Sequence, residues 1–218
     1  MAPAFRVRRR HIAGLATAAL FTWIAVDLYA PRREDFRDFD PVTMGRIEGE
    51  MWRSYYERRP ARLFWQLANS HRLQYHMGPW RSLATAYRAA KSAFIFKDGK
   101  SREEYGKALP DLEQYFATVS ALSLTPFDAH RAAQDELEWW IIRREPKRFT
   151  TVDWERLVAA VAGEIYQLPA ERFAEYSKLR VEAMVLRDKR GAAITEEDWA
   201  QVQRLLERSW NALAMALR

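Results

Sequence analysis

The sequence predicts an all-α protein with one N-terminal transmembrane helix, followed by a soluble helical bundle of seven or eight helices. An apolar run over residues 12–30 follows a cluster of arginines. Glycine is scarce and β-branched runs are nearly absent. In the rest of the chain, apolar residues recur every three or four positions between proline and glycine breaks, a spacing typical of amphipathic helices.

The apolar run has the properties of a membrane anchor. A helix needs about 20 mostly apolar residues to cross the ~30 Å hydrocarbon core of a bilayer. Asp27 is the only charge in the run and falls near its end, where headgroup depth can accommodate it. Trp23 and Tyr29 lie near the same end, as interfacial aromatic residues do. A buried or surface-lying helix is the alternative, but the run is apolar on all faces.

A cleavable signal peptide would also begin with basic residues and an apolar core. The segment Leu28-Tyr29-Ala30 has a large residue three positions before the possible cut, and Pro31 follows. We therefore expect an uncleaved signal anchor, with cleavage as the alternative. Arginines on the N-terminal side favour a cytoplasmic N-terminus, a single pass through the inner membrane and a periplasmic domain.

Three segments follow from this interpretation. Residues 1–30 form a cytoplasmic basic tail and the transmembrane signal anchor. Residues 31–40 form a juxtamembrane linker whose charges nearly cancel, as in a solvated spacer. Residues 41–218 form the helical domain, which is long enough to bury a core.

Composition excludes several classes of protein. The formal charge is +6, half of it in residues 1–30, and the remaining charges of both signs are spread along the chain. This is not the basic face of a nucleic-acid-binding protein. The chain has no cysteine, which excludes disulfides, zinc ribbons, cysteine-ligated iron–sulfur clusters and thiol catalysis.

Local signals place the helices of the domain. Asp40, Ser101 and Thr195 are predicted N-caps, and Pro60 kinks or ends the first helix. The expected helices cover residues 41–59, 61–76, 80–97, 101–124 with strain at Pro110, 126–145, 151–167, 169–190 and 195–218. In the third of these we expect four apolar side chains to face the core, namely Leu83, Tyr87, Phe94 and Ile95.

Catalytic and metal-binding patterns are weak. A ferritin-like di-metal site uses inward glutamates and Glu-x-x-His pairs, but no glutamate stands three residues before any of the four histidines. An all-carboxylate site would need several of six glutamates to converge: Glu48, Glu50, Glu136, Glu138, Glu164 and Glu182. Haem attachment, phosphate-loop and nucleophile-elbow motifs are absent. We therefore assign no catalytic residue, metal or cofactor.

Two segments, residues 50–59 and 136–145, share a pattern of acid, bulky aromatic residues and then two arginines. Packing of the two helices against each other is one interpretation. The other is a protein contact, because Trp, Tyr and Arg dominate interface hot spots. The candidate interface residues are Trp52, Tyr55, Tyr56, Trp139, Trp140, Arg143 and Arg144.

On the stretches Met51-Trp52-Arg53-Ser54-Tyr55-Tyr56 and Glu138-Trp139-Trp140, the chain resembles uncharacterised membrane-anchored helical proteins of bacteria. This resemblance covers most of the soluble part and transfers no site. We expect a non-enzymatic accessory or structural subunit of a larger membrane complex, of respiratory or photosynthetic kind, whose partners are the bilayer and other subunits. A carboxylate-bridged di-metal oxidase is the alternative, and a pigment- or lipid-binding bundle with a large apolar cavity is a third class.

Overall fold

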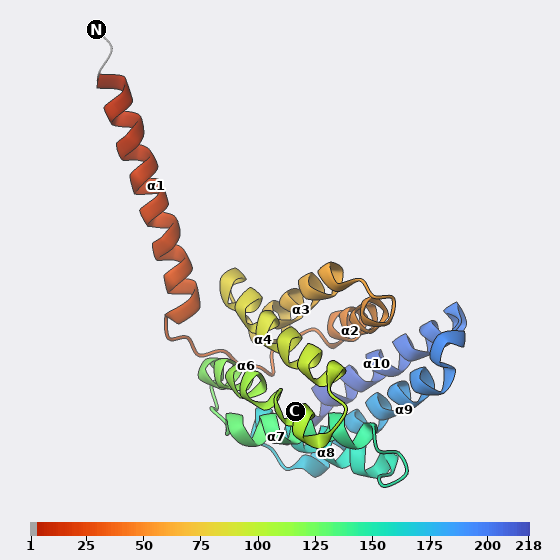
Figure 1. The fold of residues 1–218 in the computed structure, drawn as a ribbon. Coiled ribbons are helices and arrows are strands. Elements are labelled where there is room, and N and C mark those ends of the chain that lie inside the picture. Colours follow the sequence, from red (N-terminus) through yellow and green to blue (C-terminus); the bar gives the residue numbers. More distant parts are fainter. Residues whose placement is uncertain (1–3) are drawn as a thin grey trace.

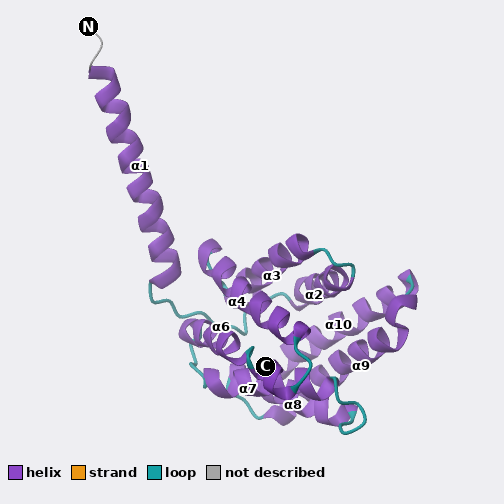
Figure 2. Ribbon diagram, in the orientation of Figure 1, coloured by secondary structure: helices purple, strands orange, loops and turns teal. Residues whose placement is uncertain are grey.

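The computed structural model describes the backbone of residues 4–218 and the surroundings of side chains from His11 onward. The first three residues of the predicted basic tail, and the side chains of its arginines, lie outside this description. The described chain is helical, with one isolated β-bridge between Glu34 and Ser123 and no β-strand (Figure 2). The prediction of an all-α fold is confirmed.

The α-helices are α1 (Ala4–Tyr29), α2 (Pro41–Tyr56), α3 (Pro60–Tyr75), α4 (Pro79–Asp98), α5 (Arg102–Gly106), α6 (Leu109–Leu122), α7 (Ala129–Arg143), α8 (Thr151–Tyr166), α9 (Ala174–Arg190) and α10 (Glu196–Ala216). Two short 3₁₀ helices, η1 (Ala170–Phe173) and η2 (Gly191–Ala193), flank α9.

Eight of these helices form a closed ring. In chain order, α2, α3, α4, α6, α7, α8, α9 and α10 each pack against the next, and α10 packs back against α2. In Figure 1 the layer of α2, α3 and α4 lies above the layer of α7 and α8, with the α9–α10 hairpin closing one side. Short links between consecutive helices favour such neighbour packing.

Two glycines of α2 allow the ring to close against α10. A Cβ atom on Gly45 would lie 2.6 Å from the Cα of Glu207, and one on Gly49 would lie 1.9 Å from Oε1 of Gln203. In return, the Gln203 side chain donates a hydrogen bond of 3.1 Å to the Gly45 carbonyl. The missing side chains bring the α2 backbone close to α10, as small residues do at tight helix crossings.

Capping signals located several helix starts correctly. Asp40 accepts hydrogen bonds from the Val42 and Thr43 amides, and Thr195 forms a capping box with Asp198. Other boundaries differ. The helix expected over residues 101–124 is two helices, because Pro110 occupies the first turn of α6 instead of straining a helix interior. This split gives nine α-helices after α1 in the described chain.

The expected core face of α4 is wrong at two of its four positions, whereas Leu83 is partly buried and Ile95 packs against the core. Tyr87 and Phe94 are 57% and 51% exposed. Small side chains face the interior instead, and Ser82, Ala86 and Ser92 are fully buried. Ser82 and Ser92 satisfy their hydroxyl groups by donating to carbonyls of their own helix, which lets α4 approach α3 and α6 closely.

Helix α1 extends away from the ring and contacts the domain only near its C-terminal end (Figure 1). Its segment His11–Tyr29 is long and apolar enough to cross a membrane, and 6% of that segment is buried. This supports the predicted anchor by length and composition.

The end of α1 is joined to the start of α4 by Asp27, which is 3% exposed. The Asp27 carboxylate accepts hydrogen bonds of 2.7 and 3.1 Å from the backbone amides of Trp80 and Arg81. The Arg81 side chain donates back to the carbonyls of Leu28 and Ala30, each at 2.9 Å. Carboxylates are stabilised at helix N-termini by free amides and the helix dipole. Asp27 therefore belongs to the fold of the domain.

The balanced charges of residues 31–40 had suggested a solvated spacer. In the structure this segment, between α1 and α2, packs against the domain instead. Phe36 is 3% exposed and packs against Tyr75. The Glu34 amide donates to the Leu122 carbonyl at 2.7 Å, and the Leu124 amide donates to the Glu34 carbonyl at 3.0 Å. The linker is thus attached to the end of α6.

Candidate functional site

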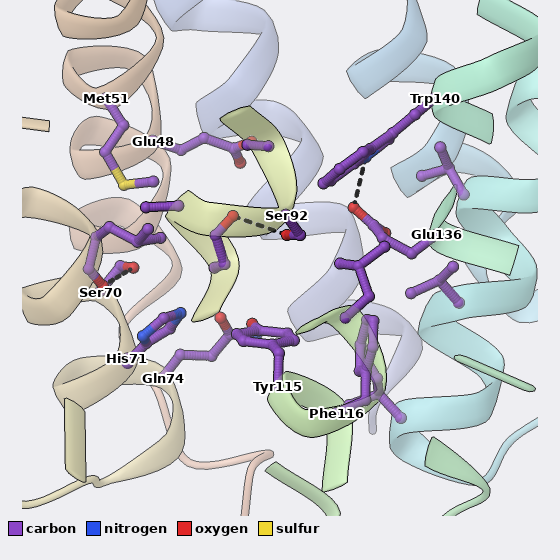
Figure 3. Close-up of a pocket in the computed structure, with 18 of the residues that line it drawn as sticks. Glu48, Met51, Ser70, His71, Gln74, Ser92, Tyr115, Phe116, Glu136 and Trp140 are labelled. Atoms are coloured by element: carbon purple, nitrogen blue, oxygen red, sulfur yellow. Dashed lines mark hydrogen bonds between the residues drawn. The ribbon is translucent and has the colours of Figure 1, made fainter. Parts of the chain in front are cut away.

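The ring of helices surrounds a partly open cavity of about 430 Å³. All eight ring helices contribute to its wall, and most of the wall is apolar. Figure 3 shows part of this lining. Its aliphatic and aromatic lining includes Met44, Met51, Leu63, Phe64, Leu67, Phe116, Val161 and Ile165. The volume falls within the range of small-molecule binding pockets, about 300–1,000 Å³.

One wall of the cavity carries a buried ion pair between Glu48 of α2 and Arg180 of α9. The Glu48 carboxylate also accepts the indole N–H of Trp52 at 3.1 Å and that of Trp210, on α10, at 2.6 Å. Glu48 is 6% exposed, so each of these donors replaces lost water. Three ring helices are therefore connected through one carboxylate.

A second carboxylate, Glu136 of α7, faces the same cavity. It accepts the indole N–H of Trp140 at 2.9 Å, as Figure 3 shows. Glu136 is partly buried, and its side chain lines the cavity. Burial raises the pKa of Glu136, and the neighbouring Glu48 adds to this effect while Arg180 opposes it. Glu136 therefore holds a proton more strongly than an exposed glutamate.

Neutral polar groups gather at the end of the cavity where His71, Gln74 and Tyr115 lie (Figure 3). His71 is 3% exposed, and its Nδ1 has no hydrogen-bond partner among the described residues. Burial lowers the pKa of His71 to about 4, so its ring is neutral near pH 7. Gln74 donates a hydrogen bond of 3.3 Å to the hydroxyl group of Tyr166. This end offers hydrogen bonds without net charge.

A second cavity, of about 510 Å³, adjoins the first. It is lined by all seven residues that the sequence singled out, namely Trp52, Tyr55, Tyr56, Trp139, Trp140, Arg143 and Arg144. The ends of α2 and α7 therefore face a shared space. One direct link crosses it, a hydrogen bond of 3.3 Å from Arg143 to the hydroxyl group of Tyr56.

Within this group the two adjacent arginines differ. Arg143 is paired with Asp188 through two hydrogen bonds of 2.7 and 2.9 Å. Arg144 is exposed, and its guanidinium lies 4.2 Å from the centre of the Phe96 ring. Its N–H groups point to the carbonyls of Gly99 and Lys97 at 3.3 and 3.5 Å. Among the described residues no carboxylate pairs with Arg144.

Sequence reasoning missed Arg180, His71 and Tyr115. A signal for Arg180 was present, because it lies four residues after Tyr176 and three before Ala183 on the face of α9 expected to be inward. A charge at such a position indicates a buried partner. Nothing in the sequence alone distinguishes His71 and Tyr115 from ordinary core residues.

The six glutamates considered for a metal site do not converge. Only Glu48 and Glu136 reach the cavity. The others pair with Arg46 (Glu50) and Arg102 (Glu138), accept the Asp128 amide (Glu164) or lie exposed (Glu182). In the described part of the chain, no group of three or more His, Asp or Glu side chains is placed to hold a metal ion. A carboxylate-bridged metal pair thus lacks its ligand set there.

Comparison of the chain with family models, with curated protein sequences and with solved structures gives no match in any of the three.

The geometry of the cavity offers groups suited to binding. Around the cavity, Glu48 is fully paired, His71 is neutral and the tyrosines are protonated because burial raises their pKa values. The arrangement suits an apolar molecule, or the apolar part of one, with hydrogen bonds available at its ends.

Proposed function

We propose that this chain is a non-enzymatic, single-pass accessory subunit of a larger bacterial membrane complex. The observation that carries the proposal is the joint between α1 and α4, formed by Asp27 and Arg81. In a signal peptide that is removed after export, a carboxylate that caps a helix of the mature domain would have no role. An anchor fixed in this way holds the domain in one orientation, as docking against neighbouring subunits requires.

Two surfaces are available for such neighbours. Helix α1 exposes large apolar side chains, with Leu15 and Phe21 72% and 65% exposed. It also carries a small-residue face over Ala13, Ala16 and Thr17, suited to close packing with another membrane helix. On the domain, exposed Tyr55 and Arg144 line the second cavity, and both residue types are enriched at interface hot spots.

The proposal includes the inner membrane as location, with a cytoplasmic N-terminus and a periplasmic domain. Because the chain has no cysteine, a single reporter tests this cleanly. Lys107→Cys introduces a thiol at an exposed position of the domain. A membrane-impermeant maleimide is expected to label this variant in intact cells once the outer membrane is permeabilised. Labelling only after lysis would show that the domain lies on the cytoplasmic side, the opposite of the proposed orientation.

Assembly is tested by crosslinking in native membranes, followed by solubilisation in mild detergent and native electrophoresis. The wild-type chain is expected to migrate with defined companion proteins. Asp27→Ala, which uncouples the anchor from α4, is expected to lose them while remaining in the membrane. Asp38→Ala, an exposed acid of the linker, is the matched control and should retain them. A wild-type chain that stays alone after crosslinking would overturn the proposal.

A further inference from the structure

We propose that the two adjoining cavities form one binding site for a single-chain amphipathic anion, with its apolar tail among the ring helices and its head group beside Arg144. This site shares the second cavity with a surface suggested above for a neighbouring subunit, but it does not depend on the α1–α4 joint that carries the accessory role. Either proposal can fail while the other stands.

The tail fits the first cavity by volume and polarity. Side chains from α2, α3 and α8 line it, including Met51, Leu63, Leu67 and Val161. Two of the four charged groups in its wall, Glu48 and Arg180, are paired with each other, and Glu48 also accepts two indole N–H groups. Glu136 accepts the indole N–H of Trp140, and Lys97 is exposed. An apolar chain therefore meets apolar surface along most of this space.

The two cavities are continuous along one wall. Met51, Tyr55, Ala93, Trp139 and Trp140 line both. In Figure 3, Met51 and Trp140 are separated along the cavity from His71, Gln74 and Tyr115. An apolar tail that enters past Met51 and Trp140 would end before it reaches the polar groups at the far end of the cavity. This limits the length of the tail.

The head group is assigned by charge. Three arginines line the second cavity, Arg143, Arg144 and Arg180, against two carboxylates, Glu136 and Asp188. Asp188 is occupied by Arg143, and Arg180 is paired with Glu48, so that Arg144 is the remaining arginine. Burial makes Glu136 easier to protonate than an exposed glutamate. Arg144 keeps a cationic edge available while its face stacks on Phe96 and Tyr105. A carboxylate or phosphate at this position would gain a charge-assisted hydrogen bond.

Tryptophan fluorescence reads this site directly, because Trp139, Trp140 and Trp210 line the first cavity, which receives the brominated tail. The probe is ω-bromoundecanoate, whose bromine quenches tryptophan emission on contact, added to the full chain in phosphatidylcholine nanodiscs. The neutral control of the same length is ω-bromoundecanol. Quenching through the bilayer, for example of Trp23, is subtracted with Ala93→Phe, which fills the shared wall.

Saturable quenching by the acid is expected in the wild type and absent in Ala93→Phe. Arg144→Gln is expected to weaken the acid by about tenfold or more and to leave the alcohol unchanged. Arg148→Gln is the matched control, because Arg148 is equally a surface guanidinium near an aromatic ring but lines neither cavity. It should shift the affinity for the acid by less than about twofold.

Dodecanoate and dodecyl phosphate, added as competitors, distinguish the two head groups, and displacement by either supports the site. Three outcomes overturn it. The first is that the wild type shows no saturable quenching, or that saturable quenching persists in Ala93→Phe. The second is equal affinity for acid and alcohol with no effect of Arg144→Gln. The third is failure of both competitors to displace the probe.

Discussion

Two carboxylates face the same cavity, but they receive very different sets of hydrogen-bond donors. Glu48 receives Arg180 and the indole N–H groups of Trp52 and Trp210. Among the hydrogen bonds of the described residues, Glu136 receives the indole N–H of Trp140. Both residues are helical glutamates with an aromatic residue four positions later, so local sequence does not separate them.

The difference lies in which helices supply the donors. Those of Glu48 come from α2, α9 and α10, at the place where the ring closes. The donor of Glu136 comes from its own helix, one turn later. Glu48 thus connects distant parts of the chain, whereas Glu136 keeps hydrogen-bonding capacity that faces the cavity. The first is expected to govern stability and the second to respond to pH and to ligand.

The largest expected effect is that of removing Glu48. Glu48→Ala leaves the Arg180 guanidinium buried without its partner, which typically costs about 3–5 kcal/mol of unfolding free energy. Urea unfolding of the full chain in mild detergent, followed by tryptophan emission, measures this loss. The double variant Glu48→Ala, Arg180→Leu should recover part of it, because no unpaired charge remains. A loss below about 1 kcal/mol for the single variant would place the ion pair outside the determinants of stability.

His71 is expected to make the protein less stable as the pH falls. Its pKa is lowered by burial from 6.5 to about 4, so the unfolded chain binds more protons between these values. Stability should therefore fall as pH decreases through this interval, by roughly 3 kcal/mol from this residue. Unfolding titrations of His71→Gln between pH 4 and pH 7 should lack this part of the decline. Exposed His130→Gln, the control, should keep it.

The smallest effect is expected at Glu136. Its pKa is raised above the ordinary 4.5, so the folded chain binds more protons than the unfolded chain just above that pH. The contribution of Glu136 to stability therefore decreases as pH rises through this window. Glu136→Gln should match the wild type at pH 4 and exceed it in unfolding free energy at pH 7. A variant that is equally destabilised at both values would show that the carboxylate, not the proton, is required.

Helix positions were largely predictable because their determinants are local. Asp40, Thr195 and the proline breaks act within one turn, and the structure follows them. Pro110 shows the limit, because the same residue that strains a helix interior fits well in a first turn. Which of these two contexts applies depends on where one helix ends and the next begins. Here Ser101 caps the short helix α5, and α6 begins after Ala108.

The cavity was not predictable in this way. Its existence depends on how eight helices close into a ring, which involves Gly45, Gly49 and the small buried side chains of α4. Hydrophobicity assigns large residues to the core, and this led to the wrong placement of Tyr87 and Phe94. The recurrence of the aromatic and arginine pattern did identify residues that share one space, although it gave no indication that the space is a cavity.

The joint at Asp27 has an evolutionary consequence. A Cβ atom on residue 78 would lie 1.5 Å from Oδ1 of Asp27, so the carboxylate is tolerated only beside glycine. The Arg81 side chain in turn binds the carbonyls that follow Asp27. Positions 27, 78 and 81 are therefore expected to change together among homologues, linking selection on α1 to selection on the domain. A lineage that exchanges α1 for another helix must also remodel the start of α4.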